Sequence, residues 1–484
     1  MKRLLLRLAA ISSLLLVAAA GQASSRPRYG GTVRVLLHDK VMSIDPLSED
    51  DHPASRDRLA TLAFETLTDI DVLGRVRPKL ASSWHSDQAK RVWQLRLRLA
   101  NFHDGTLLTA ADVAASLGKS NNNWKCTVND RQTLTIETPS PVTHMLELLA
   151  LPKYAIVKRL PDSNAGTGPY RLTEWKAGER ALFAVNEDYW GGRAYPDAIE
   201  FQMGASLRDQ LLERQLGKYA AAEVSIDQLR TLEQTNQNIA LSLPADLFAV
   251  LFLQPESPAK PGRKPVDARV REALANAIDR SAISNAFLQR KGIRASGLLP
   301  QWLTGYEFMV PGNVDLVPGN VDLKRARELR ADAAAFVVIN PIALAYDSSD
   351  PLAKLVAEKI AVDASAVGII VHPYGELHIN SKTARASLNA DAVLLRLPLQ
   401  SAEPSVALSV LADDLGFSDS VPAIFGATRQ EDLFEVERKT VVSYRVIPVA
   451  HLPQVLWLSG SVHNWQQLVN GAWQLDQLWV EGAR

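Results

Sequence analysis

The sequence predicts a mixed α/β protein of two or three domains, and three observations support this. The chain has 484 residues, more than a single hydrophobic core usually organises. Residues 92–99, Val-Trp-Gln-Leu-Arg-Leu-Arg-Leu, alternate between apolar and polar side chains, a period of two that is typical of a half-buried strand. After Asp267, the apolar residues Val270, Leu274 and Ile278 recur on one face of a helix.

Residues 1–23 have the three parts of a secretory signal peptide. Lys2, Arg3 and Arg7 precede the apolar run 14–20, and the small residues around Ala23 follow it. The apolar run is shorter than the roughly 20 residues that a membrane-spanning helix needs. The pattern therefore favours a cleaved export signal over a membrane anchor, with cleavage after Ala23.

The single cysteine and the balanced charge narrow the class of protein further. Cys126 lies deep in the chain, so we expect no disulfide within the chain, a buried thiol, and no lipid-anchor cysteine beside the cleavage site. These features predict a free periplasmic protein. Lys and Arg number 53, as do Asp and Glu, and this zero formal charge speaks against a nucleic-acid partner.

The first half of the chain contains clear signals for single elements. Gly30-Gly31 precedes a predicted strand over 32–37, and Asp104-Gly105 marks a turn. Thr109 with Asp112 has the spacing of a capping box at a helix start. Ser281 is placed to cap a second helix after the one that begins at Asp267.

Two segments have the composition of linkers or loops. Residues 255–265 contain four prolines, which fits a stiff crossing between lobes. Residues 310–316, Val-Pro-Gly-Asn-Val-Asp-Leu, are repeated at once as 317–323. A tandem this short is interpreted as a duplicated surface turn, because loops tolerate insertions at little cost.

The chain shows no convincing catalytic or metal-binding motif. It has no His-Glu-x-x-His and no Gly-x-Ser-x-Gly. His372 and His378, six apart across a Pro and a Gly, are interpreted as ordinary loop histidines. The sequence therefore predicts no enzyme, no cofactor and no bound metal, although a hydrolase whose residues meet only in space stays open.

Six motifs in a fixed order resemble the family 5 extracellular solute-binding proteins, which include oligopeptide-, dipeptide- and nickel-binding receptors of ABC importers. The resemblance covers about residues 29 to 300. The motifs are Tyr-Gly-Gly-Thr at 29–32, Pro-Lys-Leu-Ala-Ser-Ser-Trp at 78–84, Phe-His-Asp-Gly-Thr at 102–106 with its helix start, Gly-Thr-Gly-Pro-Tyr at 166–170, Asn-Glu-Asp-Tyr-Trp-Gly-Gly at 186–192, and Asp-Ala-Arg-Val-Arg-Glu-Ala-Leu at 267–274.

These motifs are mainly structural. Gly105, Gly166 and Gly168 suit turns or close backbone approach. The aromatic residues of the motifs, Trp84, Tyr170 and Trp190, are predicted to lie in the core and not on a ligand platform.

The resemblance implies a two-lobed periplasmic binding protein fold with three subdomains and a ligand cleft between the lobes. Domain I would comprise residues 28–253, as two subdomains, and return at 440–484; domain II would be 254–439. The implied partners are a small solute, such as a peptide, and an ABC permease in the inner membrane, and the implied state is a monomer.

The residues that would anchor the ligand differ from the family pattern. Peptide-binding members carry Trp-x-x-Asp shortly before a Pro, and the Asp holds the free amino terminus of the peptide. Aligning on Glu403-Pro404 puts Leu397 at the Trp position and Gln400 at the Asp position. Losing one partner of a buried charge pair costs about 2–5 kcal/mol, so either Glu403 replaces the anchor or the ligand lacks a free ammonium.

Arg396, expected on the same loop, would meet an anionic group of a ligand. The alternative is that both Arg396 and Glu403 point into solvent. For the whole chain, two further functions stay open beside an importer receptor: a binding module that serves sensing without transport, and a periplasmic hydrolase.

Overall fold

The computed structural model describes residues 27–49, 53–161, 163–204, 217–235, 237–253, 265–309, 314–468, 472–475 and 477–481. The predicted signal peptide lies outside these residues, as do nearly all of the proline-rich segment and the start of the seven-residue repeat. Within the described ranges, no helix is both long enough and apolar enough to cross a bilayer.

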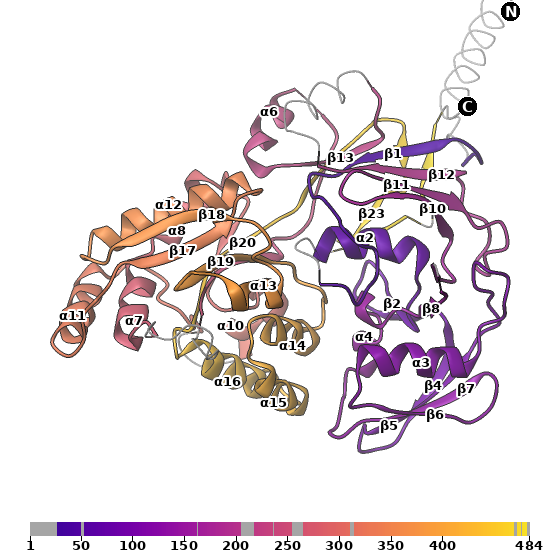
Figure 1. Ribbon diagram of the computed structural model, residues 1–484, viewed down its shortest axis with the longest axis horizontal. Coiled ribbons are helices and arrows are strands. Elements are labelled where there is room, and N and C mark those ends of the chain that lie inside the picture. The colour runs from indigo at the N-terminus through magenta and orange to yellow at the C-terminus, as the bar shows by residue number, and fades with distance from the viewer. Residues whose placement is uncertain are drawn as a thin grey trace, which may run out of the picture.

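The chain forms two lobes that lie side by side (Figure 1). Lobe I is built on a seven-stranded sheet in which β1 pairs in parallel with β12 and β13. The order of its strands is β10 (Tyr170–Lys176), β11 (Arg180–Val185), β12 (Ala198–Gln202), β1 (Thr32–Leu36), β13 (Ala221–Val224), β21 (Val455–Leu458) and β14 (Ile239–Leu241).

A four-stranded antiparallel sheet forms a second part of lobe I with its own apolar core. Its strands are β4 (Ala81–Ser86), β5 (Val92–Leu97), β7 (Thr133–Glu137) and β6 (Lys125–Val128). Lobe I also contains the helices α2 (Pro53–Ala63), α3 (Ala110–Ser120), α4 (Met145–Leu148) and α6 (Leu229–Gln234), and the 3₁₀ turns η1 (Pro152–Tyr154) and η2 (Ile226–Gln228).

Four two-stranded pairs complete the described part of lobe I. They are β2 (Thr68–Ile70) with β3 (Val76–Pro78), β8 (Lys158–Arg159) with β9 (Asn164–Ala165), β22 (Val462–His463) with β25 (Trp479–Val480), and β23 (Gln466–Gln467) with β24 (Trp473–Gln474).

Lobe II is built on a six-stranded mixed sheet. The order is β16 (Ile293–Arg294), β20 (Val446–Leu452), β15 (Asp246–Phe252), β19 (Ala392–Leu397), β17 (Ile342–Asp347) and β18 (Val371–Glu376). Its helices are α7 (Ala268–Ala277), α8 (Arg280–Ala286), α9 (Gln301–Thr304), α10 (Tyr306–Met309), α11 (Leu323–Ala334), α12 (Pro351–Ser365), α13 (Lys382–Ser387), α14 (Pro404–Asp414), α15 (Val421–Gly426) and α16 (Gln430–Val441), with the 3₁₀ turn η3 (Ser418–Ser420).

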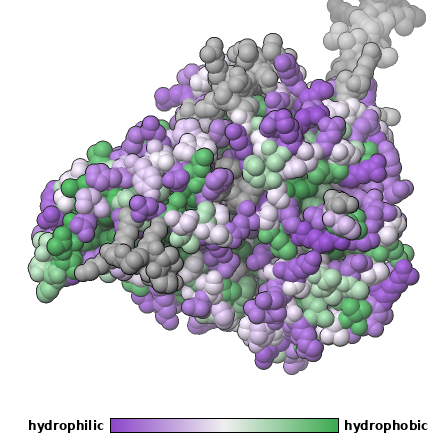
Figure 2. All heavy atoms as spheres, viewed as in Figure 1, coloured by the Kyte–Doolittle hydropathy of each residue, from purple (hydrophilic) through white to green (hydrophobic). Residues whose placement is uncertain are grey.

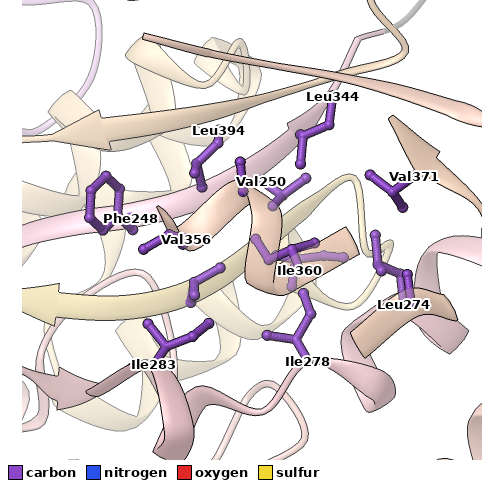
Figure 3. Packing of buried hydrophobic residues seen from close by; sticks show 14 of the residues in the cluster. Phe248, Val250, Leu274, Ile278, Ile283, Leu344, Val356, Ile360, Val371 and Leu394 are labelled. Atoms are coloured by element: carbon purple, nitrogen blue, oxygen red, sulfur yellow. The ribbon is translucent and has the colours of Figure 1, made fainter. Parts of the chain in front are cut away.

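Helices cover the lobe II sheet, and its central strands are buried along their whole length. Every residue of β15 and of β20 is buried. On one face, Val250 and Leu394 pack against Val356 and Ile360 of α12 and against Leu274 of α7 (Figure 3). Burial of this size is the main favourable contribution to folding.

The chain crosses between the lobes twice, at 242–245 and at 453–454. These segments join β14 to β15 and β20 to β21, whose partners lie in different sheets. The predicted boundaries of domain I, 253 for its first part and 440 for its return, differ from this arrangement, because β15 and β20 both pair within lobe II. We therefore place lobe II at 246–452, and the residues flanking the proline-rich segment both belong to it.

Most of the elements predicted singly are confirmed. Strands begin at Thr32 and Val92, Gly105 has a φ of 81°, and Thr109 forms a complete capping box with Asp112. Asp267 caps α7 through the backbone N–H of Arg269. The predicted cap Ser281 is wrong: Asp279 caps α8 instead, by accepting from the backbone N–H of Ala282 at 2.8 Å.

Candidate ligand-binding cleft

The two lobes touch along the face where α13 and α14 of lobe II lie opposite lobe I (Figure 1). Ser381 Oγ of lobe II donates to Glu49 of lobe I at 2.7 Å. Val406 of α14 is fully buried in the core of the four-stranded part of lobe I. These contacts show that the structure is a closed arrangement of the lobes.

Among the residues that the structure describes, at least three cavities lie between the lobes. The central cavity, of about 250 Å³, is formed by α2, β2–β3 and β24 of lobe I together with residues 398–402 of lobe II. The hinge cavity, of about 150 Å³, lies beside the two crossings. The outer cavity, of about 780 Å³, lies between α13–α15 and the segments around Glu49 and Trp124. Clefts between two lobes are where small ligands commonly bind.

Gln400 lies between two of these cavities. It follows β19 in the loop that enters the cleft, and it lines both the central and the outer cavity. The loop is fixed at its far end by the start of α14, where Pro404 occupies the first turn. Of the three predicted site residues, Gln400 is the one that lines the central cavity.

Arg396 lies within β19 and not on the loop as predicted, because the strand extends to Leu397. Its guanidinium donates twice to Asp246 Oδ2, at 2.9 and 3.1 Å, and lies 3.6 Å from Asp350 Oδ2. Burial lowers the pKa of Arg396, but the nearby carboxylates outweigh this and raise it. Because Asp246 and Asp350 balance its charge, Arg396 should attract an anionic ligand less strongly than the sequence predicted.

Glu403 is the N-cap of α14. Its Oε2 accepts from the backbone N–H of Val406 at 2.8 Å and from Ser405 Oγ at 2.6 Å, while its Oε1 lies 3.6 Å from His144 Nε2 of lobe I. A hydrogen bond to Glu147 raises the pKa of His144, as does the charge of Glu403, and burial opposes them. These contacts favour a capping and lobe-joining role for Glu403 over a ligand anchor.

The aromatic wall of the central cavity is positioned by a buried carboxylate that the sequence analysis did not single out. Glu65 accepts from Thr167 Oγ1 at 2.8 Å, Tyr189 Oη at 2.7 Å and Trp190 Nε1 at 2.9 Å. Burial raises the pKa of Glu65. Trp190 is only partly buried and lines the central cavity, so it belongs to the cleft as well as to the core.

Other cleft residues come from segments distant in sequence, and no local pattern marked them. Arg58 of α2 is buried, donates to Glu223 of β13, and stacks 4.4 Å from the ring centre of Trp473. Gln454, at the second crossing, lines the central and hinge cavities, as Arg58 does. Their partners lie up to about four hundred residues away in the sequence, so these contacts are apparent only in the folded structure.

The hinge cavity is rich in acidic side chains. Asp39, Glu223, Asp246, Asp347 and Asp350 line it, and they face Arg58 and Arg396. Among the described residues, no group of three or more His, Cys, Asp or Glu is arranged to hold a metal ion. Burial raises the pKa of the Cys126 thiol to about 11, which keeps it protonated and unreactive at neutral pH.

Two lobes joined by two adjacent crossings, with cavities between them whose walls come from both, define a two-lobed ligand-binding protein. The chain belongs to the bacterial extracellular solute-binding proteins, family 5, whose profile matches residues 75–418. The resemblance stated from the sequence is thereby confirmed.

Curated relatives include binding proteins for peptides and for nickel. The chain is 22% identical over 352 residues to the oligopeptide-binding protein AppA of Bacillus subtilis, covering 65% of this chain and 61% of AppA. It is 27% identical over 300 residues to the nickel-binding protein NikA of Staphylococcus aureus, covering 58% of each chain. The chain thus spans about three fifths of the length of these relatives.

Solved structures share the fold over nearly the whole chain. NikA from Staphylococcus aureus in complex with Ni(L-His)2 has a TM-score of 0.77 at 18% identity, covering 93% of this chain and 100% of NikA. AppA from Bacillus subtilis in complex with a nonapeptide has a TM-score of 0.78 at 16% identity, covering 94% and 100%. The predicted two-lobed α/β fold is confirmed.

Proposed function

We propose that this protein is the periplasmic substrate-binding receptor of an ABC importer, and that it is not an enzyme. It encloses a peptide or another small solute between its lobes and delivers it to a permease in the inner membrane. The observation that carries the proposal is the central cavity, whose walls come from α2 and β24 of lobe I and from residues 398–402 of lobe II. A solute there contacts both lobes and therefore stabilises the closed form.

The family and the names of its curated relatives support this function. Those relatives are binding proteins for dipeptides, oligopeptides and nickel. Export through the signal peptide at residues 1–23, with no cysteine next to the cleavage site, agrees with a receptor that is free in the periplasm. In this proposal the protein acts as a monomer, because both walls of the central cavity come from one chain.

A thermal-shift screen of residues 24–484 tests the proposal. The panel contains dipeptides, oligopeptides, peptides with blocked amino termini, sugars and nickel chelates. A ligand at one hundred times its dissociation constant adds about 2.7 kcal/mol of stability, which raises the melting temperature measurably. No shift across the whole panel would favour a sensing module with another ligand over an importer receptor of this class.

The neutral side chain of Gln400 makes the amino terminus of a peptide the critical test. A carboxamide accepts a hydrogen bond from an ammonium but does not neutralise its charge. We therefore expect blocked peptides or non-peptide solutes to stabilise the protein more than peptides with a free amine. The opposite order would show that Gln400 does not set the choice of ligand.

The variant Gln400→Asp tests the same residue by restoring the carboxylate of the family pattern. A buried charge pair that gains its missing partner recovers about 2–5 kcal/mol, or at least about thirtyfold in affinity, so free-amine peptides should bind much better to the variant. Gln474→Asp is the matched control, because Gln474 also lines the central cavity but on the lobe I wall, where it donates to the Ile70 carbonyl at 2.8 Å. An equal gain in the control would contradict a position-specific anchor.

A further inference from the structure

The backbone of Gln454 ties the two lobe crossings together. Its N–H donates to Ser242 Oγ at 2.9 Å, and the N–H of Ser242 donates to the Gln454 carbonyl at 3.1 Å. Ser242 belongs to the first crossing and Gln454 to the second. The two segments about which the lobes turn are therefore joined at this point, and the position of Gln454 is fixed by both.

The side chain of Gln454 contacts a charged residue in each lobe. Its Oε1 accepts from Arg58 Nη2 of lobe I, and its Nε2 donates to Asp246 Oδ1 of lobe II at 2.9 Å. Both charged partners are buried, with relative exposures of 7% for Arg58 and 4% for Asp246. The amide thus bridges a buried cation and a buried anion that belong to different lobes.

The bridge is the middle of a longer chain of polar contacts. On the lobe I side, Arg58 also donates to Glu223 of β13. On the lobe II side, Asp246 accepts from Arg396 of β19 through its second oxygen. Every charge in this chain is compensated by a neighbour, so a break at Gln454 would leave both Arg58 and Asp246 short of one partner.

The amide of Gln454 satisfies both neighbours at once. It presents one acceptor and one donor without net charge. A carboxylate at position 454 would suit Arg58 but repel Asp246, and an ammonium would do the reverse. An apolar side chain would leave both buried charges with an unmade hydrogen bond, which costs about 1–3 kcal/mol for each group.

The bridge also forms part of the cleft wall. Arg58 and Gln454 line the central cavity on one side and the hinge cavity on the other. The Arg58 guanidinium lies over Trp473, which lines the central cavity as well. A solute in the central cavity would therefore contact residues that are hydrogen-bonded to each other across the hinge.

We propose that Gln454 is a positioning residue for lobe closure, because its amide holds Arg58 of lobe I and Asp246 of lobe II in fixed relative positions. Through this bridge, a solute that contacts the wall of the central cavity affects the hinge. This inference deepens the proposed receptor function and rests on it for its biological meaning. The bridge itself is a property of the ligand-free protein, so it is tested without knowing the ligand.

The experiment measures the distance between the lobes by double electron–electron resonance in the absence of ligand. Spin labels are attached through Leu99→Cys in lobe I and Val362→Cys in lobe II, which are 67% and 64% exposed. Cys126→Ser removes the only natural thiol. Gln454→Leu and Gln454→Glu are each expected to broaden the distance distribution and shift it to longer distances.

A second substitution tests the polarity of the bridge. In the double variant Gln454→Glu with Asp246→Asn, the new amide at 246 donates to the new carboxylate at 454 and still accepts from Arg396. We expect this variant to regain the narrow distribution of the parent protein. Far-UV circular dichroism confirms that each variant is folded before its distances are interpreted.

Gln237→Leu is the matched control. Gln237 Oε1 accepts from Trp457 Nε1 at 3.0 Å, and both residues belong to lobe I. Its loss removes a glutamine hydrogen bond near the hinge without breaking a contact between lobes, so the distribution should not change. Unchanged distributions in both Gln454 variants, or a double variant that stays displaced, would overturn the proposal while leaving the ligand screen unaffected.

Discussion

Single residues fix the backbone beside the cleft, and Gly166 is the sharpest case. A Cβ at this position would lie 1.9 Å from the Ala63 carbonyl oxygen at the end of α2. The neighbouring Gly168 donates its N–H to the same carbonyl at 2.9 Å. The close approach that the sequence predicted for the two glycines is confirmed, because the requirement for a missing side chain is local and shows in the residue type itself.

Gly166→Ala should therefore destabilise the protein. Inserting an atom into packed backbone costs about 1–3 kcal/mol or more, which corresponds to a loss of several degrees in melting temperature at about 2–4 °C per kcal/mol. Gly118→Ala is the control, since nothing lies within 4 Å of its Cβ position in the helix α3, and it should be neutral or slightly stabilising. Equal melting temperatures for the two variants would contradict the close approach at Gly166.

At the scale of elements, the sequence predicted starts and turns better than sheet membership. Thr109 and Asp267 mark helix starts through contacts within three residues, and such local contacts leave a pattern in the sequence. The strands β15 and β20 are buried at every position, so they lack the alternation that would show which face meets which layer. Their place in lobe II depends on pairing with β19 and with each other, and no local pattern encodes that pairing.

Helix α14 provides a test of what Glu403 does. As the N-cap, Glu403 should be replaceable by Ser, a preferred capping residue, whereas Glu403→Ala should lower the free energy of unfolding by about 1 kcal/mol. Urea unfolding of the two variants measures this difference. If Glu403→Ser instead abolishes the response to a ligand found in the screen while its stability is retained, the residue acts on the ligand and the capping interpretation is insufficient.

At the scale of the whole molecule, the order of the motifs identified the fold, while the charges that join the lobes could not be read from the sequence. Alignment on Glu403-Pro404 singled out Gln400, which lines the central cavity; its role toward a ligand stays a prediction. The partners of Arg396 were missed because Asp246 lies 150 residues away. Figure 2 shows hydrophilic and hydrophobic side chains mixed on this face, with hydrophobic ones at the tip of lobe II near α11 and others over lobe I. Phe336 and Val338, which follow α11, are exposed.

Two buried groups should affect the pH dependence of unfolding in opposite directions. Glu437 accepts from the backbone N–H of Leu298 at 2.7 Å, and burial raises its pKa from 4.5 to about 7. His451 lies 3.0 Å from the carbonyl of the same Leu298, and burial lowers its pKa from 6.5 to about 4. Tyr306 hydrogen-bonds to Glu437, and Asp246 lies near His451.

The signs of the two effects are opposite. Between pH 4.5 and 7 the folded protein holds a proton on Glu437 that the unfolded chain releases, so stability falls as pH rises. Between pH 4 and 6.5 the unfolded chain protonates His451 and the folded protein does not, so stability rises with pH. Each shift is worth about 3 kcal/mol across its range, and the two nearly offset each other between pH 4.5 and 6.5.

Replacing one member should expose the slope of the other. Relative to the parent protein, His451→Gln should lose stability as the pH rises from 4.5 to 6.5, and Glu437→Gln should gain it, by up to about 1.4 kcal/mol per pH unit. Urea unfolding across this range measures both differences, and the other titrating groups cancel because all three proteins share them. Since either substitution also removes a hydrogen bond, the slope with pH is the informative quantity; curves that run parallel to the parent would show that neither group changes its protonation on unfolding.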